Sequence, residues 1–288
     1  MSISAFIKRY PVLTYFALTF LISWGLILLL IAFNGMPATT AEANAQLPVA
    51  ILAMLGGPSI SGLLLTGLVN GRPGYRELWA RLLKWRVGVK WYAIALLTAP
   101  AVMLPVQYVM TLFSPVYQFG FLGPNGSSMV FLGVMSGILV GICEELGWFG
   151  FAIPKLRLRY NVLLTGLMVG VLWGAWHIMA NDIWAIRTYS GDLNPTLYAV
   201  IAGISYLIGQ LPPFRILMVW IYEQTGSLLV MMVMHFSLTA CNISFASQTA
   251  SGVQVLIYIF AQAAAMWGIA AAVVAANRVE LSRQPRNN

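Results

Sequence analysis

Long apolar runs are the feature that most constrains how this chain can fold. Hydrophobic residues make up 60% of its 288 residues and charged residues only 8%, against about 25% charged in soluble proteins. A membrane-spanning helix needs about 20 apolar residues, whereas a closed barrel needs short alternating strands. The sequence therefore predicts an all-α, polytopic transmembrane helix bundle. About eight spans are expected, at Val12–Phe33, Leu47–Leu68, Trp91–Phe113, Met129–Ile153, Val162–Ala180, Thr196–Leu211, Ser227–Ile243 and Val255–Ala276.

Basic residues gather in alternate connections between these runs. The connections around Glu42, over 115–128 and around Gln248 contain no Lys or Arg. Because cytoplasmic loops are enriched in Lys and Arg, we expect a multi-pass protein of the cell membrane with both termini in the cytoplasm. This topology accounts for the net charge of +8 and gives no reason to expect a nucleic-acid partner. The lipid bilayer is an expected partner. The basic residues concerned are Lys8, Arg9, Arg72, Arg76, Arg81, Lys84, Arg86, Lys90, Lys155, Arg157, Arg159, Arg215, Arg278, Arg283 and Arg286.

The longest polar connection, Asn70–Lys90, carries a helical pattern of its own. Its apolar positions recur at helical spacing, with basic residues elsewhere on the same helix, which is typical of an amphipathic helix in the cytoplasmic membrane interface. A substrate-docking surface is the alternative. Since the chain has no long linker, low-complexity tract or obvious repeat, residues 1–288 are predicted to form a single transmembrane domain. The apolar positions are Leu78, Trp79, Leu82 and Trp85.

Two adjacent carboxylates, Glu144 and Glu145, lie inside the fourth apolar run. An ionised side chain in the middle of a bilayer costs about 3 kcal/mol or more, so such residues indicate a functional site by default. The only two histidines of the chain, His177 and His235, also fall inside predicted spans. Two carboxylates and two imidazoles at membrane depth favour a shared site over isolated packing positions.

These side chains are compatible with two kinds of hydrolysis. Glu144, His177 and His235 can bind a metal such as zinc with a position left open for water. Without a metal, a glutamate can act as general base while the imidazoles orient the water and stabilise the oxyanion. The sequence leaves the choice between zinc and no metal open, and it predicts no other cofactor. It contains neither a His-Glu-x-x-His motif nor a convincing Ser-His-Asp set.

Helical spacing places two further side chains beside the imidazoles. Trp173 lies one turn before His177 and can stack on its ring, and Thr239 lies one turn after His235 and can donate its hydroxyl to an oxyanion. Simple packing is the alternative for both residues.

Two geometric expectations follow for the fourth span. Gly147 and Gly150 remove side-chain bulk next to the acids and predict the close approach of another helix. Straight helices would leave Glu145 and His177 roughly 10 Å apart in depth. A shared site therefore requires the fifth span to begin below the end of the fourth, or the connection between them to dip into the bundle.

The order and spacing of these residues resemble a known family. The stretches Glu144-Glu145-Leu-Gly-Trp-Phe, Trp173-x-x-x-His177 and His235-x-x-x-Thr239 are similar to the patterns Glu-Glu-x-x-x-Arg, Phe-x-x-x-His and His-x-x-x-Asn. These patterns are typical of the CPBP family of CAAX-processing endoproteases and Abi-type bacteriocin-processing or immunity proteins. Trp85–Tyr92 and Arg215–Gly226 also resemble the family. The likeness covers about residues 50–245.

The resemblance implies an intramembrane endopeptidase similar to type II CAAX prenyl endopeptidases. Such an enzyme hydrolyses a peptide bond near the membrane surface, in a membrane-associated peptide or protein. By this resemblance Glu144 activates water, while His177 and His235 help to hold that water and the developing oxyanion. Glu145 would orient and support these groups. Members are often described as metalloproteases, which keeps both chemistries open.

Two positions depart from the family pattern. Phe149 stands where arginine is usual, and Thr239 where asparagine is frequent. The acids thus lack a basic partner in their own motif, and Arg215 is a candidate to supply that charge from another helix. These departures motivate an alternative function, a non-catalytic membrane binding, scaffold or immunity-type protein on the same fold. A small transporter or proton-coupled carrier is a third, because buried acids and histidines also build proton relays.

Overall fold

The computed structural model describes residues 2–189 and 191–277, apart from the side chains of Asn181, Asp182 and Ala185. All regular elements in this part of the chain are helical, as the apolar runs predict. The α-helices are α1 (Ile3–Arg9), α2 (Pro11–Asn34), α3 (Thr40–Leu65), α4 (Gly71–Leu82), α5 (Val89–Phe113), α6 (Gly126–Gly147), α7 (Ile153–Leu156), α8 (Val162–Thr188), α9 (Pro195–Ile204), α10 (Leu211–Thr225), α11 (Leu228–Phe245) and α12 (Val253–Ala276). Three π-helical segments, Thr66–Asn70, Trp148–Ala152 and Ser205–Gln210, join α3 to α4, α6 to α7 and α9 to α10, and two 3-10 turns, Pro115–Tyr117 and Gly120–Leu122, precede α6.

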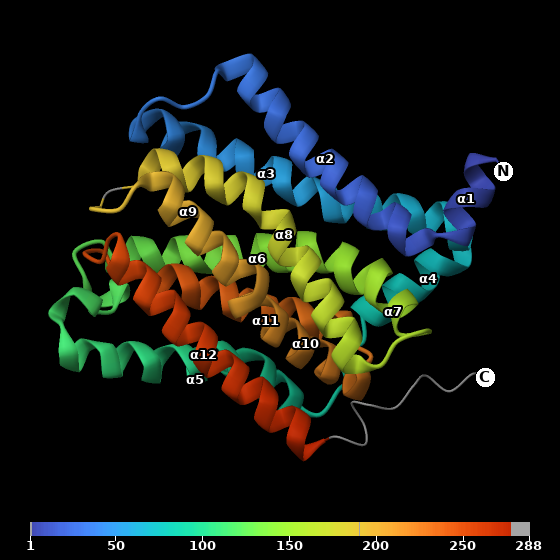
Figure 1. Cartoon of the computed structure of the whole chain (residues 1–288). Coiled ribbons are helices and arrows are strands. Elements are labelled where there is room, and N and C mark those ends of the chain that lie inside the picture. Colours follow the sequence, from blue (N-terminus) through green and yellow to red (C-terminus); the bar gives the residue numbers. More distant parts are fainter. Residues whose placement is uncertain (1, 190, 278–288) are drawn as a thin grey trace.

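Eight helical stretches among the described residues are long and apolar enough to cross a membrane, which confirms the predicted polytopic bundle. In Figure 1, α6 and α11 lie at its centre, with α2, α3 and α8 on one side and α5 and α12 on the other. An even number of spans leaves both ends of the described chain on one side. That this side is the cytoplasm stays a prediction from charge, and its contributors Arg278, Arg283 and Arg286 lie outside the described residues.

The sixth span ends later than predicted. One apolar stretch runs from Pro195 to Thr225, because Pro212 and Pro213 stand in the first turn of α10 and do not break the chain. Proline suits this position, where its missing N–H would have no helical partner. Arg215 was expected in a cytoplasmic connection. It is instead fully buried inside the bundle, so it does not contribute to the surface charge that sets topology.

Helix α4 lies where the amphipathic pattern predicts a helix. Leu78 is buried in the core and Trp79 is exposed, although Trp85 falls beyond the end of the helix. Arg81 of α4 donates to the carbonyl oxygens of Phe149 and Gly150, at 3.0 and 2.8 Å. A π-helical turn disturbs the regular backbone hydrogen bonds. Arg81 therefore supports the π-helical segment that directly follows the two glutamates.

A row of glycines allows α6 to approach α11 closely. Gly133, Gly137 and Gly141 recur at every fourth position and so share one face of α6. A Cβ atom at Gly137 or Gly141 would lie 2.7 Å from a carbonyl oxygen of α11, that of Phe236 or Met232. This contact sets the end of α6 that carries the glutamates against the helix that carries His235.

The two glycines singled out from the sequence have unequal roles. A Cβ atom on Gly147 would collide with the backbone of Pro58 in α3 and with the hydroxyl of Tyr15. The expected close approach of another helix is thus confirmed there. At Gly150 the first neighbour of a Cβ atom would be the side chain of Leu78, at 3.1 Å. Such a neighbour can adjust, so Gly150 is the less constrained of the two.

Replacing Gly141 by valine is expected to lower the thermal stability of the purified protein. The added side chain would meet the backbone of α11, and overpacking of this kind typically costs about 1–3 kcal/mol. Thermal unfolding in detergent measures the effect. The matched control is Gly268→Val on α12, where nothing lies within 4 Å of an added Cβ atom. An equal loss of stability in both variants would contradict the close packing of α6 on α11.

Candidate active site

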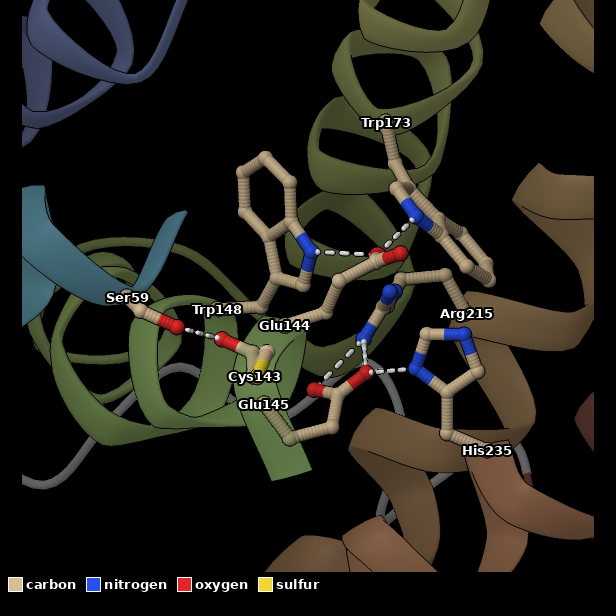
Figure 2. Close-up of polar contacts among 8 residues, drawn as sticks. All are labelled: Ser59, Cys143, Glu144, Glu145, Trp148, Trp173, Arg215 and His235. Atoms are coloured by element: carbon tan, nitrogen blue, oxygen red, sulfur yellow. Dashed lines mark hydrogen bonds and ion pairs between the residues drawn. The ribbon is translucent and has the colours of Figure 1, made fainter. Parts of the chain in front are cut away.

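The two glutamates lie near the end of α6 and are both buried, with 2% of Glu144 and 0% of Glu145 exposed. Successive residues on a helix point about 100° apart, so the two carboxylates meet different neighbours. Glu144 points toward α8, and Glu145 points toward side chains of α10 and α11 (Figure 2). Two distinct environments therefore stand side by side at adjacent positions of the chain.

Glu145 is held by two basic side chains. Arg215 Nη1 lies 3.0 Å from each of its carboxylate oxygens, and His235 Nδ1 lies 2.6 Å from Oε1. Since a carboxylate accepts, His235 donates through Nδ1, which leaves Nε2 directed away from Glu145. The structure thus joins three residues that are 70 and 90 positions apart in the sequence.

Arg215 supplies the basic partner that the glutamate motif lacks. Its guanidinium carbon lies 4.0 Å from the ring centre of Trp173 and 5.5 Å from that of Phe149. Its Nε and Nη2 atoms are buried without a hydrogen-bond partner in the described part of the chain. The aromatic faces give the cation a favourable electrostatic contact where water is excluded. The charge expected from a motif arginine at position 149 comes from α10 instead.

Glu144 is held by two tryptophans. Its Oε2 accepts hydrogen bonds from Trp148 Nε1 at 3.0 Å and from Trp173 Nε1 at 2.7 Å. Hydrogen bonds to an ionised acceptor are stronger than neutral ones, so this carboxylate is fixed in position through one oxygen. None of the hydrogen bonds among the described residues uses the other oxygen, Oε1. Trp148 lies four residues after Glu144, a spacing that makes the two residues neighbours on a helix but does not by itself identify the indole as a donor.

Glu144 lines a cavity of about 170 Å³. Glu144 and His177 line it together with Trp176 and with apolar side chains of α3, among them Met54 and Leu55. The volume exceeds that of a single water, which occupies about 30 Å³ in the liquid. A polar pair therefore faces a mainly apolar space that has room for water or for part of a ligand.

His177 joins the site through this cavity and through ring contacts. Its Nδ1 lies 2.8 Å from the backbone carbonyl oxygen of Trp173. A carbonyl accepts, so Nδ1 carries the proton and the neutral ring keeps Nε2 as an acceptor. Trp173 contacts the ring of His177 edge-on and does not stack on it, with the two ring centres 5.7 Å apart. It also contacts the ring of His235 edge-on, with ring centres 5.0 Å apart.

His177 does not reach the glutamates directly, in line with the depth offset expected from straight helices. Trp173, one turn before His177, is the residue of α8 that bonds directly to Glu144. In the described residues no hydrogen bond links His177 to either glutamate. Thr239 lies half-buried on α11, one turn beyond His235. It too forms no hydrogen bond with the glutamates among the residues that the structure describes, so its predicted role rests on its position in the motif.

The candidate metal ligands are not gathered into one cluster in the described part of the chain. No three His, Cys, Asp or Glu side chains within 2–189 and 191–277 lie together in a way that can hold a metal ion. Oε2 of Glu144 is held by Trp148 and Trp173, and Nδ1 of His177 and of His235 is held by a backbone carbonyl and by Glu145, respectively. The ligand atoms left over, Oε1 of Glu144 and Nε2 of each histidine, are of kinds that can bind zinc, but the described side chains are not gathered as a metal centre requires.

The described residues form a helical membrane bundle in which two adjacent glutamates and two histidines surround a buried site. Residues 126–241 match the family model described as type II CAAX prenyl endopeptidase Rce1-like. The chain is also 24% identical over 236 residues to a protein of Methanococcus maripaludis named CAAX prenyl protease 2, covering 79% of this chain and 82% of that protein. Both similarities support a protease of the CPBP family, of the CAAX-type endopeptidase class.

Replacing Arg215 by methionine is expected to reduce the free energy of unfolding by about 3–5 kcal/mol, because Glu145 would keep a buried charge without its cation. Adding Phe149→Arg to this variant should recover part of the loss, since residue 149 lies beside the guanidinium. Thermal unfolding in detergent compares the variants, with Arg86→Met as the control at an exposed position. If the double variant is no more stable than Arg215→Met, an arginine at position 149 cannot replace the arginine that α10 supplies.

Proposed function

We propose that this protein is an intramembrane endopeptidase in which Glu144 activates the attacking water. The observation that carries the proposal is the environment of this carboxylate. Two indole N–H groups hold Oε2, while Glu144 lines a cavity shared with His177. A general base must be fixed in position and must reach the proton that it removes. Oε1 of Glu144 is suited to that task.

In the proposed reaction, the water oxygen attacks the carbonyl carbon of the scissile peptide bond. One of its protons passes to Oε1 of Glu144 and then to the amine nitrogen as the carbon–nitrogen bond breaks. The new carboxyl group keeps the water oxygen, the amine leaves, and the carboxylate of Glu144 is regenerated. His177 holds the same water through Nε2, because its Nδ1 proton is engaged by the carbonyl of Trp173. Fixing water and base in one cavity removes much of the entropic cost of bringing them together.

The second glutamate has a supporting role in this proposal. Glu145, paired with Arg215, orients His235 through its Nδ1. When His235 is doubly protonated, its Nε2–H can donate to the oxyanion that develops on the peptide carbonyl. Thr239 is proposed to add a hydroxyl donor from the next turn of α11. Trp173 lies between the surroundings of Glu144 and those of Glu145, since it donates to Glu144 and contacts the rings of both histidines.

The proposed substrate is a membrane-associated peptide or protein, cleaved near the surface of the cell membrane. The name of the M. maripaludis relative points to CAAX-type sequences. The apolar side chains that α3 contributes to the cavity suit an apolar residue or lipid group of such a substrate. A prenylated peptide and its unprenylated form are therefore the first pair to test.

Glu144→Gln is expected to lower kcat for cleavage of a prenylated CAAX peptide by about 10²–10⁴-fold, the usual contribution of a positioned general base. The amide keeps the size and the hydrogen bonds of the side chain but cannot take the proton. Product formation by purified protein in lipid vesicles is measured by mass spectrometry. Glu42→Gln, at the distant start of α3, is the control and should retain activity.

The outcomes separate the functional classes. Cleavage that persists in Glu144→Gln would remove this residue from the role of base. A wild-type protein that binds such peptides without cleaving them would favour the non-catalytic alternative. Ion flux in liposomes without cleavage would favour a carrier.

Trp148→Phe tests whether the indole donors matter to the base. The variant removes one of the two hydrogen bonds to Oε2 of Glu144 while keeping an aromatic ring against Tyr15 and Phe16. Hydrogen bonds to charged groups contribute about 1.5–3 kcal/mol, so kcat should fall about 10–100-fold with a smaller change in KM. Phe20→Leu, elsewhere on α2, is the packing control. An unchanged kcat in Trp148→Phe would contradict the positioning role of the indole.

A further inference from the structure

A second and larger cavity, of about 450 Å³, opens at one end of the bundle. It lies between the junction of α1 with α2, the turn that follows α7, and the first turns of α8. In Figure 1 this is the end marked by α1, α4 and α7. Glu144 and His177 line the other cavity and do not line this one. The two cavities therefore have separate linings.

The mouth of this cavity is basic. Arg9, Lys155 and Arg159 contribute from two separate segments, and none of the described residues that line it is acidic. Lys155 donates to Asn70 at 3.1 Å and lies over the ring of Phe151, and Arg9 lies over the ring of Tyr10. None of these partners carries a negative charge. Glu77, which lines a neighbouring cavity together with Lys155, offsets part of the charge of that one residue. The three cations therefore leave a net positive potential around the opening.

The interior of the cavity is apolar and extends along the membrane spans. Val12 and Phe16 line it from α2, and Met168 and Leu172 from α8. The basic residues lie at or just outside the ends of spans that begin at Pro11 and Val162 or end at Leu156. Leu172 is ten positions into its span, which corresponds to a depth of about 15 Å. The lining therefore changes from cationic at the mouth to apolar in the interior, as a phospholipid changes from its charged head group to its apolar acyl chains.

We propose that this cavity binds an anionic phospholipid of the leaflet at this end of the bundle. The phosphate would lie among Arg9, Lys155 and Arg159, and one acyl chain would lie against Phe16, Met168 and Leu172. Basic pockets between spans recognise anionic head groups in this way. A free phosphate would leave the apolar depth unfilled. Basic residues that only fix the membrane topology would not need to line a cavity. The proposal is therefore tested by comparing lipid binding after substitution of arginines that line the cavity and of an arginine that does not.

The experiment measures lipid retention and does not depend on protease activity. The full-length protein is reconstituted in vesicles that contain equal amounts of phosphatidylglycerol and phosphatidylcholine, then extracted in mild detergent, and its bound lipids are quantified by native mass spectrometry. Wild type should retain phosphatidylglycerol at least about fivefold over phosphatidylcholine. Arg9→Gln with Arg159→Gln should bring this preference close to one, because each basic residue near the surface contributes up to about fivefold.

Two matched controls distinguish a built site from general surface charge. Arg86→Gln removes a basic residue that does not line the cavity and should keep the wild-type preference. Met168→Trp fills the apolar part without a change of charge and should abolish retention, whereas Leu164→Trp at an exposed position of the same helix should not.

Three results would overturn the proposal. One is equal retention of the two lipids by wild type. Another is an equal loss of preference in Arg86→Gln. The third is displacement of the lipid by millimolar inorganic phosphate, which would indicate a site for a free anion.

Discussion

The buried ion pair between Glu145 and Arg215 is the interaction on which the arrangement of the site depends. Both side chains have no exposed surface, and taking two charges out of water is costly unless their geometry and hydrogen bonds compensate. Here one guanidinium nitrogen of Arg215 donates to both carboxylate oxygens of Glu145, and His235 donates to one of them. The ring of Trp173 packs against the guanidinium. Helices α6, α8, α10 and α11 must keep their mutual positions for all these contacts to exist. The close glycine seam between α6 and α11 is part of the same requirement.

Two adjacent carboxylates acquire different chemistry because a helix turns them toward different neighbours. Glu145 is enclosed by cationic partners, so its charge is neutralised locally and its oxygens are occupied. Glu144 has neutral indole donors on one oxygen and borders a cavity. The first environment suits a fixed structural anion and the second suits a base with access to water. Pairs of acids that differ in this way are how enzymes divide supporting and reacting roles.

An aromatic layer separates the carboxylate site from the proposed lipid cavity. Trp148 donates to Glu144 on one side and packs against Phe16, whose side chain lines the lipid cavity, with ring centres 5.8 Å apart. Trp176 lines the carboxylate cavity and contacts Trp148. The rings provide a rigid, mainly apolar wall that keeps the two spaces distinct. The π-helical segment after α6 belongs to this wall, and Arg81 supports it from α4.

Much of this protein could be predicted from the sequence, because its strongest signals are local. Runs of apolar residues determine membrane helices through the cost of leaving backbone groups unpaired in lipid. The scarcity of charge made Glu144, Glu145, His177 and His235 stand out, and the order of the motifs pointed to the family. Only the tertiary structure decided that Arg215 lies in the core, that it pairs with Glu145 in place of an arginine at position 149, and that Trp148 and Trp173 both donate to Glu144. These contacts join residues up to 90 positions apart, and their partners depend on how helices rotate and cross. No local pattern specifies that rotation, because it results from the packing of the whole bundle.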